Sequence, residues 1–189
     1  MIEIVFFGRG GQGAVTAAEV LATAASLEGK YAQAFPSFSG ERRGAPVFAY
    51  ARIDEHRIVD RGRIIKTDYL LLLDPNLLKT SNPLNDLKKN GTAILNLDRS
   101  PEDLIKKAGN PEIEVYCIDA LAISEEIYGQ KPIPITNIAM LGAFSSVSGA
   151  VQLDNIILAV DNFFSGKQAE EAKQTARMAF TKMEGAKNS

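Results

Sequence analysis

A glycine-rich loop near the N-terminus constrains this chain more than any other feature. The loop follows a short apolar run, Ile2–Phe7, and leads into an alanine-rich run over residues 14–27. Its sequence is Gly8-Arg9-Gly10-Gly11-Gln12-Gly13, in which the first, third and last residues have the G-x-G-x-x-G spacing. Glycines at this spacing let a strand turn sharply into a helix whose unpaired N–H groups can bind an anion. The segment therefore predicts a Rossmann-like first βα unit.

The residues after this helix depart from a dinucleotide-binding fold. Tyr31–Phe38 and Pro46–Ile53 both have the composition of strands, and only residues 39–45 separate them. A parallel crossover needs about a dozen residues or more, so the second of these strands is expected to run antiparallel to the first. No acid that could hold a ribose ends the Tyr31–Phe38 strand, and Ala14-Val15 stands where a Walker A loop has lysine and serine or threonine. Three interpretations stay open for the glycine loop: a tight turn, a site for another anionic ligand, or a contact with a partner chain.

The remainder of the chain alternates strands with helices. Further strands are predicted at Tyr69–Leu73, Thr92–Leu97 and Glu114–Ile118, and later helices at Asp119–Tyr128, Ile138–Val147, Asp154–Phe164 and Ala169–Met183. A short hairpin is expected to turn at Asp54–Arg57 and return through Ile58 and Val59. We therefore expect one α/β domain over residues 1–189, a three-layer α/β/α sandwich whose mainly parallel mixed sheet has at least one antiparallel strand. The tail over residues 184–189 is expected to fray.

Composition excludes several classes of function. With 21 basic and 23 acidic side chains the net charge is −2, so general nucleic-acid binding is not expected. The single cysteine, Cys117, and the single histidine, His56, supply neither an iron–sulfur cluster nor a zinc site. The apolar run Tyr69–Leu73 is too short to cross a bilayer and no signal peptide is visible, so a cytoplasmic protein without membrane contact is expected.

A second candidate segment is the connection over residues 39–45, between the predicted strands Tyr31–Phe38 and Pro46–Ile53. It contains adjacent arginines, and its candidate site residues are Ser39, Glu41, Arg42 and Arg43. Arginine can bind a phosphate or carboxylate through two parallel hydrogen bonds, although a solvated hairpin loop is the alternative. If the first two strands run parallel as neighbours, this loop and the glycine loop leave the same edge of the sheet, where α/β proteins usually bind ligands.

The two segments together resemble a known family. Gly8-Arg9-Gly10-Gly11-Gln12-Gly13-Ala14-Val15-Thr16-Ala17-Ala18-Glu19 is similar to the N-terminal signature of the gamma subunit of 2-oxoacid:ferredoxin oxidoreductases, particularly the pyruvate type. Ala34–Phe38 followed by Glu41-Arg42-Arg43-Gly44-Ala45-Pro46-Val47 resembles the second signature, and Asn137–Gly142 fits a third, looser one. The resemblance covers essentially the whole chain.

The resemblance implies a multi-subunit enzyme. Such a complex decarboxylates a 2-oxoacid oxidatively with thiamine diphosphate, Mg²⁺, coenzyme A and iron–sulfur clusters, and passes the electrons to ferredoxin. The partners implied are alpha, beta and ferredoxin-like delta subunits. This chain lacks the Gly-Asp-Gly thiamine motif and the cysteines of a cluster, so it is expected to be non-catalytic, inactive in isolation and without a metal or cofactor of its own.

The resemblance leaves two roles open for the candidate residues of the glycine and arginine segments. They could contact the phosphates of coenzyme A, or they could dock on partner subunits and only shape the site. A free-standing nucleotide-binding or regulatory module is the alternative from another functional class. Within the family, 2-oxoisovalerate and 2-oxoglutarate are the alternative substrates to pyruvate.

Overall fold

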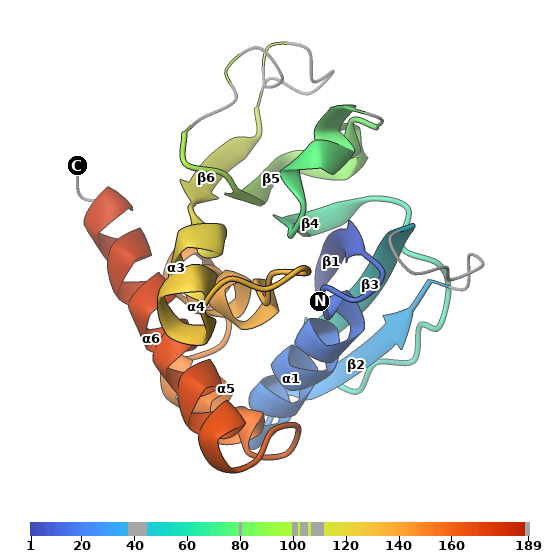
Figure 1. Cartoon of the computed structure of the whole chain (residues 1–189). Helices are drawn as coiled ribbons and strands as arrows, with labels where there is room; N and C mark the ends of the chain where they lie inside the picture. Colours follow the sequence, from blue (N-terminus) through green and yellow to red (C-terminus); the bar gives the residue numbers. More distant parts are fainter. Residues whose placement is uncertain (38–44, 80, 100–101, 103–105, 107–111, 188–189) are drawn as a thin grey trace.

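The computed structural model describes residues 1–37, 45–79, 81–99, 102, 106 and 112–187. Its centre is a six-stranded sheet with the order β2-β3-β1-β4-β5-β6 (Figure 1). The strands are β1 (Ile2–Arg9), β2 (Tyr31–Pro36), β3 (Pro46–Asp54), β4 (Thr67–Leu72), β5 (Leu87–Asn96) and β6 (Glu114–Ile118). Each of the six overlaps a strand predicted from the sequence, with ends that differ by a few residues.

Five α-helices and two 3-10 helices accompany the sheet in the described part of the chain. They are α1 (Ala14–Leu27), α3 (Ala120–Tyr128), α4 (Asn137–Ser148), α5 (Leu153–Val160) and α6 (Gly166–Lys187), with η1 (Pro75–Lys79) and η2 (Pro83–Asp86). Each of the five α-helices was predicted from the sequence. The mixed α/β fold is therefore confirmed.

One strand, β3, runs against the others. It pairs antiparallel with β1 on one side and with β2 on the other, whereas β1, β4, β5 and β6 are mutually parallel. The short 39–45 connection thus makes the antiparallel return that was predicted. The expectation that the first two strands are neighbours was wrong, because β3 lies between them. They nevertheless point the same way, so both segments leave the same edge of the sheet.

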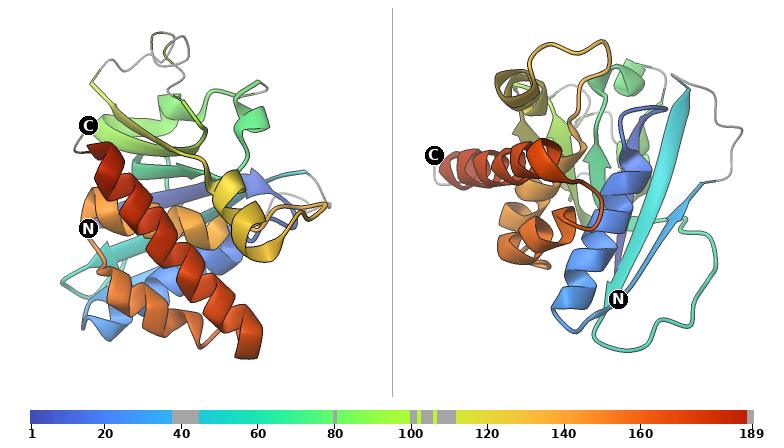
Figure 2. Two further views of the ribbon diagram at one scale, coloured as in Figure 1. Left: turned by 60° about the vertical axis from the view of Figure 1, so that its left-hand side comes forward. Right: turned by 60° about the horizontal axis from the view of Figure 1, so that its bottom comes forward.

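The two faces of the sheet are covered differently (Figure 2). The five α-helices pack on one face, where α1 and α4 contribute much of a large alanine-rich core. The other face carries a smaller core that includes Phe7, Leu72 and Leu95 and is closed by Leu77 of η1 and Leu84 of η2. Among the described residues, this second face is thus covered by 3-10 helices and irregular chain.

The side chains of β3 alternate between the two cores. Ala49, Ala51 and Ile53 face the helices and belong to the large core, whereas Phe48 and Tyr50 pack against the smaller core. Successive side chains of a strand point to opposite faces, so this pattern fixes which way β3 faces. The alanines leave room for α1 to approach closely.

Helix α4 is buried on almost every side and packs closely on α6. A Cβ atom placed on Gly142 would overlap the backbone carbonyl oxygen of Ala176. The two helix backbones can therefore approach this closely only if residue 142 is glycine.

The structure differs from the sequence predictions at two further places. Residues 55–66 form no return strand, so the expected hairpin at Ile58 and Val59 was wrong. Residues 184–187 were expected to fray but continue α6, because Glu184 accepts a hydrogen bond from Ser146 Oγ and Lys187 Nζ donates to the Ser146 carbonyl. No described helix is both long and apolar enough to cross a membrane.

Substituting Gly142 by alanine is expected to destabilise the fold. The added methyl must push α4 away from α6, and overpacking of this kind costs about 2 kcal/mol of unfolding free energy. Gly185→Ala, also in α6, is the control, because its Cβ meets no atom within 4 Å, and it should stabilise by up to about 1 kcal/mol. Urea unfolding of both variants measures the difference, and equal midpoints would contradict the close α4–α6 contact.

Cys117 is expected to react slowly with alkylating reagents. Burial, and secondarily the negative charge of Asp98, raises the pKa of its thiol to about 11. Only about one thiol in a thousand is then ionised at pH 8, and the thiolate is the reactive form. Iodoacetamide labelling followed by mass spectrometry should show a rate that climbs with pH until about 11. A rate at pH 8 equal to that of free cysteine would show that the thiol is not buried as described.

Candidate functional site

The glycine loop connects the end of β1 to the start of α1. Gly8 and Arg9 are the last residues of the strand, and Gly13 caps the helix in the left-handed conformation with φ 77°. Gly13 supplies no side-chain cap to the helix. The first N–H groups of α1, at the edge of the sheet where the parallel strands end, therefore receive no cap from this residue.

Close packing inside the chain explains three of the loop's glycines. A Cβ on Gly8 would lie 3.2 Å from Leu73 Cβ, and one on Gly11, at φ +99°, would lie 3.1 Å from the Ile133 side chain. A Cβ on Gly13 would overlap Asn137 Nδ2, which donates a 3.2 Å hydrogen bond to the Gly13 carbonyl. These glycines are needed for the turn and its neighbours, whether or not a ligand binds.

A buried carboxylate, Asp74, anchors the glycine loop through contacts with two of its side chains. Arg9 Nε donates to Asp74 Oδ2 at 2.8 Å, and Gln12 Nε2 donates to the same oxygen at 3.4 Å. Gln12 Oε1 in turn accepts the Arg9 backbone N–H at 2.8 Å. The side chains of Arg9 and Gln12 are thus used in the loop's own structure. The backbone N–H groups of Arg9, Gly10 and Gln12 are also bonded within the chain. The donors left for a ligand are therefore among the remaining N–H groups of the loop and of the first turn of α1.

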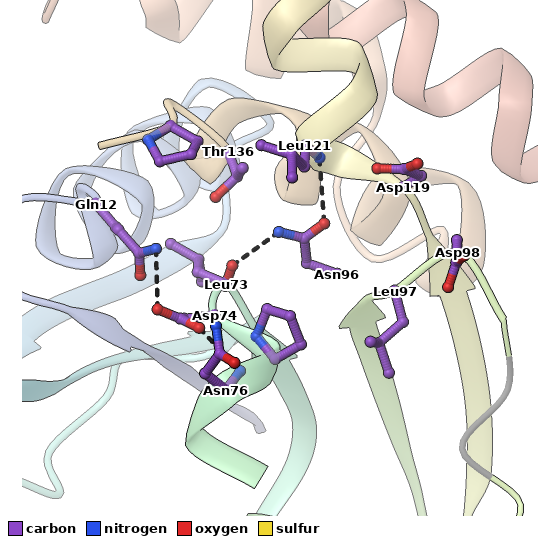
Figure 3. A pocket seen from close by; sticks show the side chains of 12 residues that line it. Gln12, Leu73, Asp74, Asn76, Asn96, Leu97, Asp98, Asp119, Leu121 and Thr136 are labelled. Atoms are coloured by element: carbon purple, nitrogen blue, oxygen red, sulfur yellow. Dashed lines mark hydrogen bonds between the residues drawn. The ribbon is translucent and has the colours of Figure 1, made fainter. Parts of the chain in front are cut away.

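A cavity of about 420 Å³ opens beside this network, at the carboxyl ends of β4 and β5 (Figure 3). Seven of its twelve lining residues are polar: Gln12, Asp74, Asn76, Asn96, Asp98, Asp119 and Thr136. Chain order reverses across the sheet between β1 and β4, and α/β proteins usually bind ligands at such a switch point. The cavity is therefore the natural ligand position beside the glycine loop.

Most polar groups in the cavity wall already have partners. Asn96 Nδ2 donates to the Leu73 carbonyl at 2.8 Å, and Asn96 Oδ1 accepts from the N–H groups of Ala120 and Leu121 (Figure 3). Asp119 caps α3 by accepting from Ala122 N at 2.8 Å. Thr136 differs, because its buried hydroxyl has no hydrogen-bond partner among the described residues. The wall is rich in acceptors, which disfavours a phosphate inside the cavity itself.

The arginine segment adjoins the glycine loop. Its candidate residues Ser39, Glu41, Arg42 and Arg43 lie outside the described residues. Both ends of the segment are described: Ser37 N donates to the Phe48 carbonyl, and Gly10 N donates to the Ala45 carbonyl, each at 2.9 Å. The two segments singled out in the sequence therefore meet at the Gly10–Ala45 hydrogen bond.

Sequence reasoning missed the importance of two residues. Asp74 directly follows the apolar run Tyr69–Leu73, a position typical of a cap or turn residue. It does accept from Asn76 N, but it also holds Arg9 and Gln12. Asn137 stands where a helix start is expected, and its contact with Gly13 spans 124 positions of sequence. A polar residue directly after a buried strand was the available signal for Asp74, whereas no local signal shows which residue Asn137 contacts.

The described residues do not form a redox or metal centre. No group of three His, Cys, Asp or Glu side chains within the described part could hold a metal ion. The arrangement can bind an anion through helix N–H groups.

Comparison with known proteins gives consistent matches along the chain. A family model described as pyruvate ferredoxin/flavodoxin oxidoreductase matches residues 3–182. The gamma subunit common to pyruvate and ketoisovalerate oxidoreductases of Pyrococcus abyssi is 46% identical over 182 residues, which cover 96% of this chain and 97% of that protein. Pyruvate synthase subunit PorC of Methanocaldococcus jannaschii is 44% identical over 183 residues, 97% of each chain. The crystal structure of pyruvate oxidoreductase subunit PORC from Thermotoga maritima has a TM-score of 0.80 and 32% identity over 95% of each chain.

Replacing Asp74 by asparagine is expected to loosen the glycine loop. The variant loses the ion pair with Arg9, which is partly exposed, and an acceptor for Gln12, at a cost of about 1–2 kcal/mol in unfolding free energy. Asp98→Asn is the matched control, because Asp98 lines the same cavity but has no hydrogen bond or ion pair in the described chain. Chemical denaturation of both variants tests this, and an unchanged Asp74→Asn stability would remove Asp74 as the anchor.

Proposed function

This chain belongs to the pyruvate ferredoxin/flavodoxin oxidoreductase family, and we propose that it is the gamma subunit of a 2-oxoacid:ferredoxin oxidoreductase complex. One observation carries the proposal: relatives named gamma subunit or PorC match it at 44–46% identity and along essentially their whole length. A match over the full length of both chains supports the same place in the same kind of assembly.

The chemistry of the complex belongs to its partner subunits. The complex interconverts a 2-oxoacid and coenzyme A with acyl-CoA and CO₂, and transfers the electrons to ferredoxin. Thiamine diphosphate with Mg²⁺ and iron–sulfur clusters supply carbanion and electron-transfer chemistry on the alpha, beta and ferredoxin-like delta chains. The residues present here do not fit either group. The chain lacks the Gly-Asp-Gly thiamine motif, and its one cysteine cannot supply the several thiolates that a cluster needs.

Pyruvate is the proposed substrate, with 2-oxoisovalerate as the alternative. The Pyrococcus abyssi relative is named as a subunit common to the pyruvate and ketoisovalerate oxidoreductases. A subunit shared by two oxidoreductases cannot itself distinguish their substrates. The groups that read the 2-oxoacid side chain are therefore placed on the other subunits.

The glycine and arginine segments are proposed to contact the phosphates of coenzyme A at an interface between subunits. Two features support this: Gly13 gives the N-terminus of α1 no side-chain cap, and Gly10 is bonded to Ala45, which follows Arg42-Arg43-Gly44 in the sequence. Helix N–H groups and arginine side chains together suit a diphosphate and a 3′-phosphate. The proposed contacts use the backbone N–H groups of Gly11, Gly13 and the first turn of α1. The side chains of Arg9 and Gln12 are bound to Asp74, and the N–H groups of residues 9, 10 and 12 are bonded within the chain.

The double variant Arg42→Ala/Arg43→Ala, studied in the assembled complex, tests this role. The KM for coenzyme A should rise about tenfold or more while the KM for the 2-oxoacid stays constant, because only the ligand phosphates lose their partners. Arg177→Ala, an exposed arginine of α6, is the control and should change neither value.

Two outcomes would contradict these proposals separately. If the KM for coenzyme A is unchanged while the subunits dissociate, the segments serve assembly and do not bind the ligand. If the chain copurifies from its native cells with no other subunit and binds NAD or ATP alone, the gamma-subunit assignment fails and a free-standing nucleotide-binding module replaces it.

A further inference from the structure

A long loop over residues 55–66 connects β3 to β4. It has no regular secondary structure and lies on the face of the sheet opposite the α-helices, where it projects as a wide lobe (Figure 2, right). Irregular connections of this length are uncommon in compact domains unless they are functional or unstructured. Neither the glycine loop nor the cavity beside it uses this segment.

A buried arginine on β3 holds the backbone of this loop in place. Arg52 of β3 has only 1% of its surface exposed, and its Nη1 and Nη2 donate to the carbonyl oxygens of Asp60 at 3.1 Å and Gly62 at 2.8 Å. Its Nε donates to Glu3 Oε1 at 3.1 Å, which balances the charge. Burying a guanidinium is costly unless it is paired and hydrogen-bonded. Here two of its hydrogen bonds are used to hold the backbone of this loop.

Further contacts hold the loop on both sides of that point. Gln33 Nε2 donates to the Ile58 carbonyl at 3.3 Å, and Lys66 Nζ donates to the Asn85 carbonyl. Ile64 is buried against the sheet. The loop is thus held in one conformation by anchors spread along its length.

The fixed loop exposes apolar and basic side chains together. Val59 and Ile65 are 84% and 77% exposed, more than any other large apolar side chain in the described chain. Arg57 and Arg61 are also exposed, and neither pairs with an acidic residue in the part of the chain that is described. The loop carries four basic and two acidic residues in a chain whose net charge is −2. It is therefore a positive, partly apolar surface on an otherwise acidic protein.

We propose that the 55–66 loop is a preformed docking surface for an acidic segment of another subunit of the complex, an inference that rests on the proposed function. Carboxylates of that segment meet Arg57 and Arg61, and its apolar side chains cover Val59 and Ile65. Arginine and exposed apolar side chains are typical of interface centres. Because the loop is already fixed, docking costs little ordering entropy.

A cavity beside the loop gives the partner a place to insert a side chain. It measures about 550 Å³ and lies between Ile65 and the half-buried Phe48 and Tyr50 of β3. Arg63 also lines it and is hydrogen-bonded to Tyr50. An apolar side chain that enters here would bury Ile65, which otherwise faces water. The partner segment is thus expected to carry an apolar residue between its acidic ones.

The triple variant Arg57→Glu/Val59→Asp/Arg61→Glu tests the proposal. It is coexpressed with the other subunits of the complex, and subunit association is measured by native mass spectrometry and by titration of the purified chain. We expect association to weaken by about tenfold or more, and to weaken further at low salt because the reversed charges now repel the partner. The control, Leu158→Asp/Arg177→Glu, alters exposed residues of α5 and α6 on the opposite face and should assemble normally.

A second measurement uses the unmodified protein and does not depend on the variant folding. Trypsin should cut the isolated chain after Arg57 or Arg61 and should be blocked there in the complete complex. Equal cleavage in both states would overturn the docking surface, as would unchanged association of the triple variant. Binding of the isolated chain to phosphatidylserine vesicles through the loop, with normal assembly, would replace a protein partner by a membrane. A wild-type chain that joins no other subunit would instead overturn the gamma-subunit assignment.

Discussion

The antiparallel pairing of β3 with β1 is the constraint on which both functional surfaces depend. The two strands are in register from Ile2 opposite Ile53 to Arg9 opposite Pro46. Pro46 therefore begins β3 beside the glycine loop, and Asp54 ends it at the far edge of the sheet. The arginine segment enters one end of β3 and the 55–66 loop leaves the other. One strand in one register thus places the proposed anion-binding edge and the positive 55–66 loop at opposite ends of the domain.

Two of the three glycines in the G-x-G-x-x-G spacing, Gly8 and Gly13, have an explanation in packing that is independent of a ligand. Gly8, Gly11 and Gly13 are each required by a neighbour within the chain: Leu73, Ile133 and Asn137. Similar glycines in dinucleotide-binding proteins let the backbone approach a pyrophosphate. The same small residues here let β4 and the segment before α4 approach the loop. The motif by itself therefore reports a crowded strand-to-helix turn, and the ligand has to be argued from the uncapped helix and the arginines.

Sequence reasoning recovered most of the fold because its signals are local. The buried run Tyr69–Leu73, the alternation in Pro46–Ile53 and the short connection before it predicted β4, β3 and its direction. The wrong predictions concern segments whose structure is set by contacts with residues far away in the sequence. Nothing near Ile58 and Val59 shows that Arg52 captures the carbonyls of residues 60 and 62, so a return strand was expected. Similarly, Ser146 supplies the partners that keep residues 184–187 helical. The site was predicted at its glycines, and Asp74 and Asn137 were underestimated because their partners are far away in sequence.

The contacts of the first βα unit with the C-terminal half have a consequence for the order of folding. Asn137 bonds to Gly13, and beyond the far end of α1 Lys30 Nζ donates to the Ala150 carbonyl while Glu28 accepts from Gln152 N. Residues synthesised early thus find these hydrogen-bond partners only after more than a hundred further residues have been added. Until α4 and α5 leave the ribosome, α1 has only its sheet-facing side covered, and its remaining apolar surface is open to solvent. The segment that is synthesised first is therefore the last to be fully packed. The nascent chain is accordingly most vulnerable to aggregation at its N-terminus.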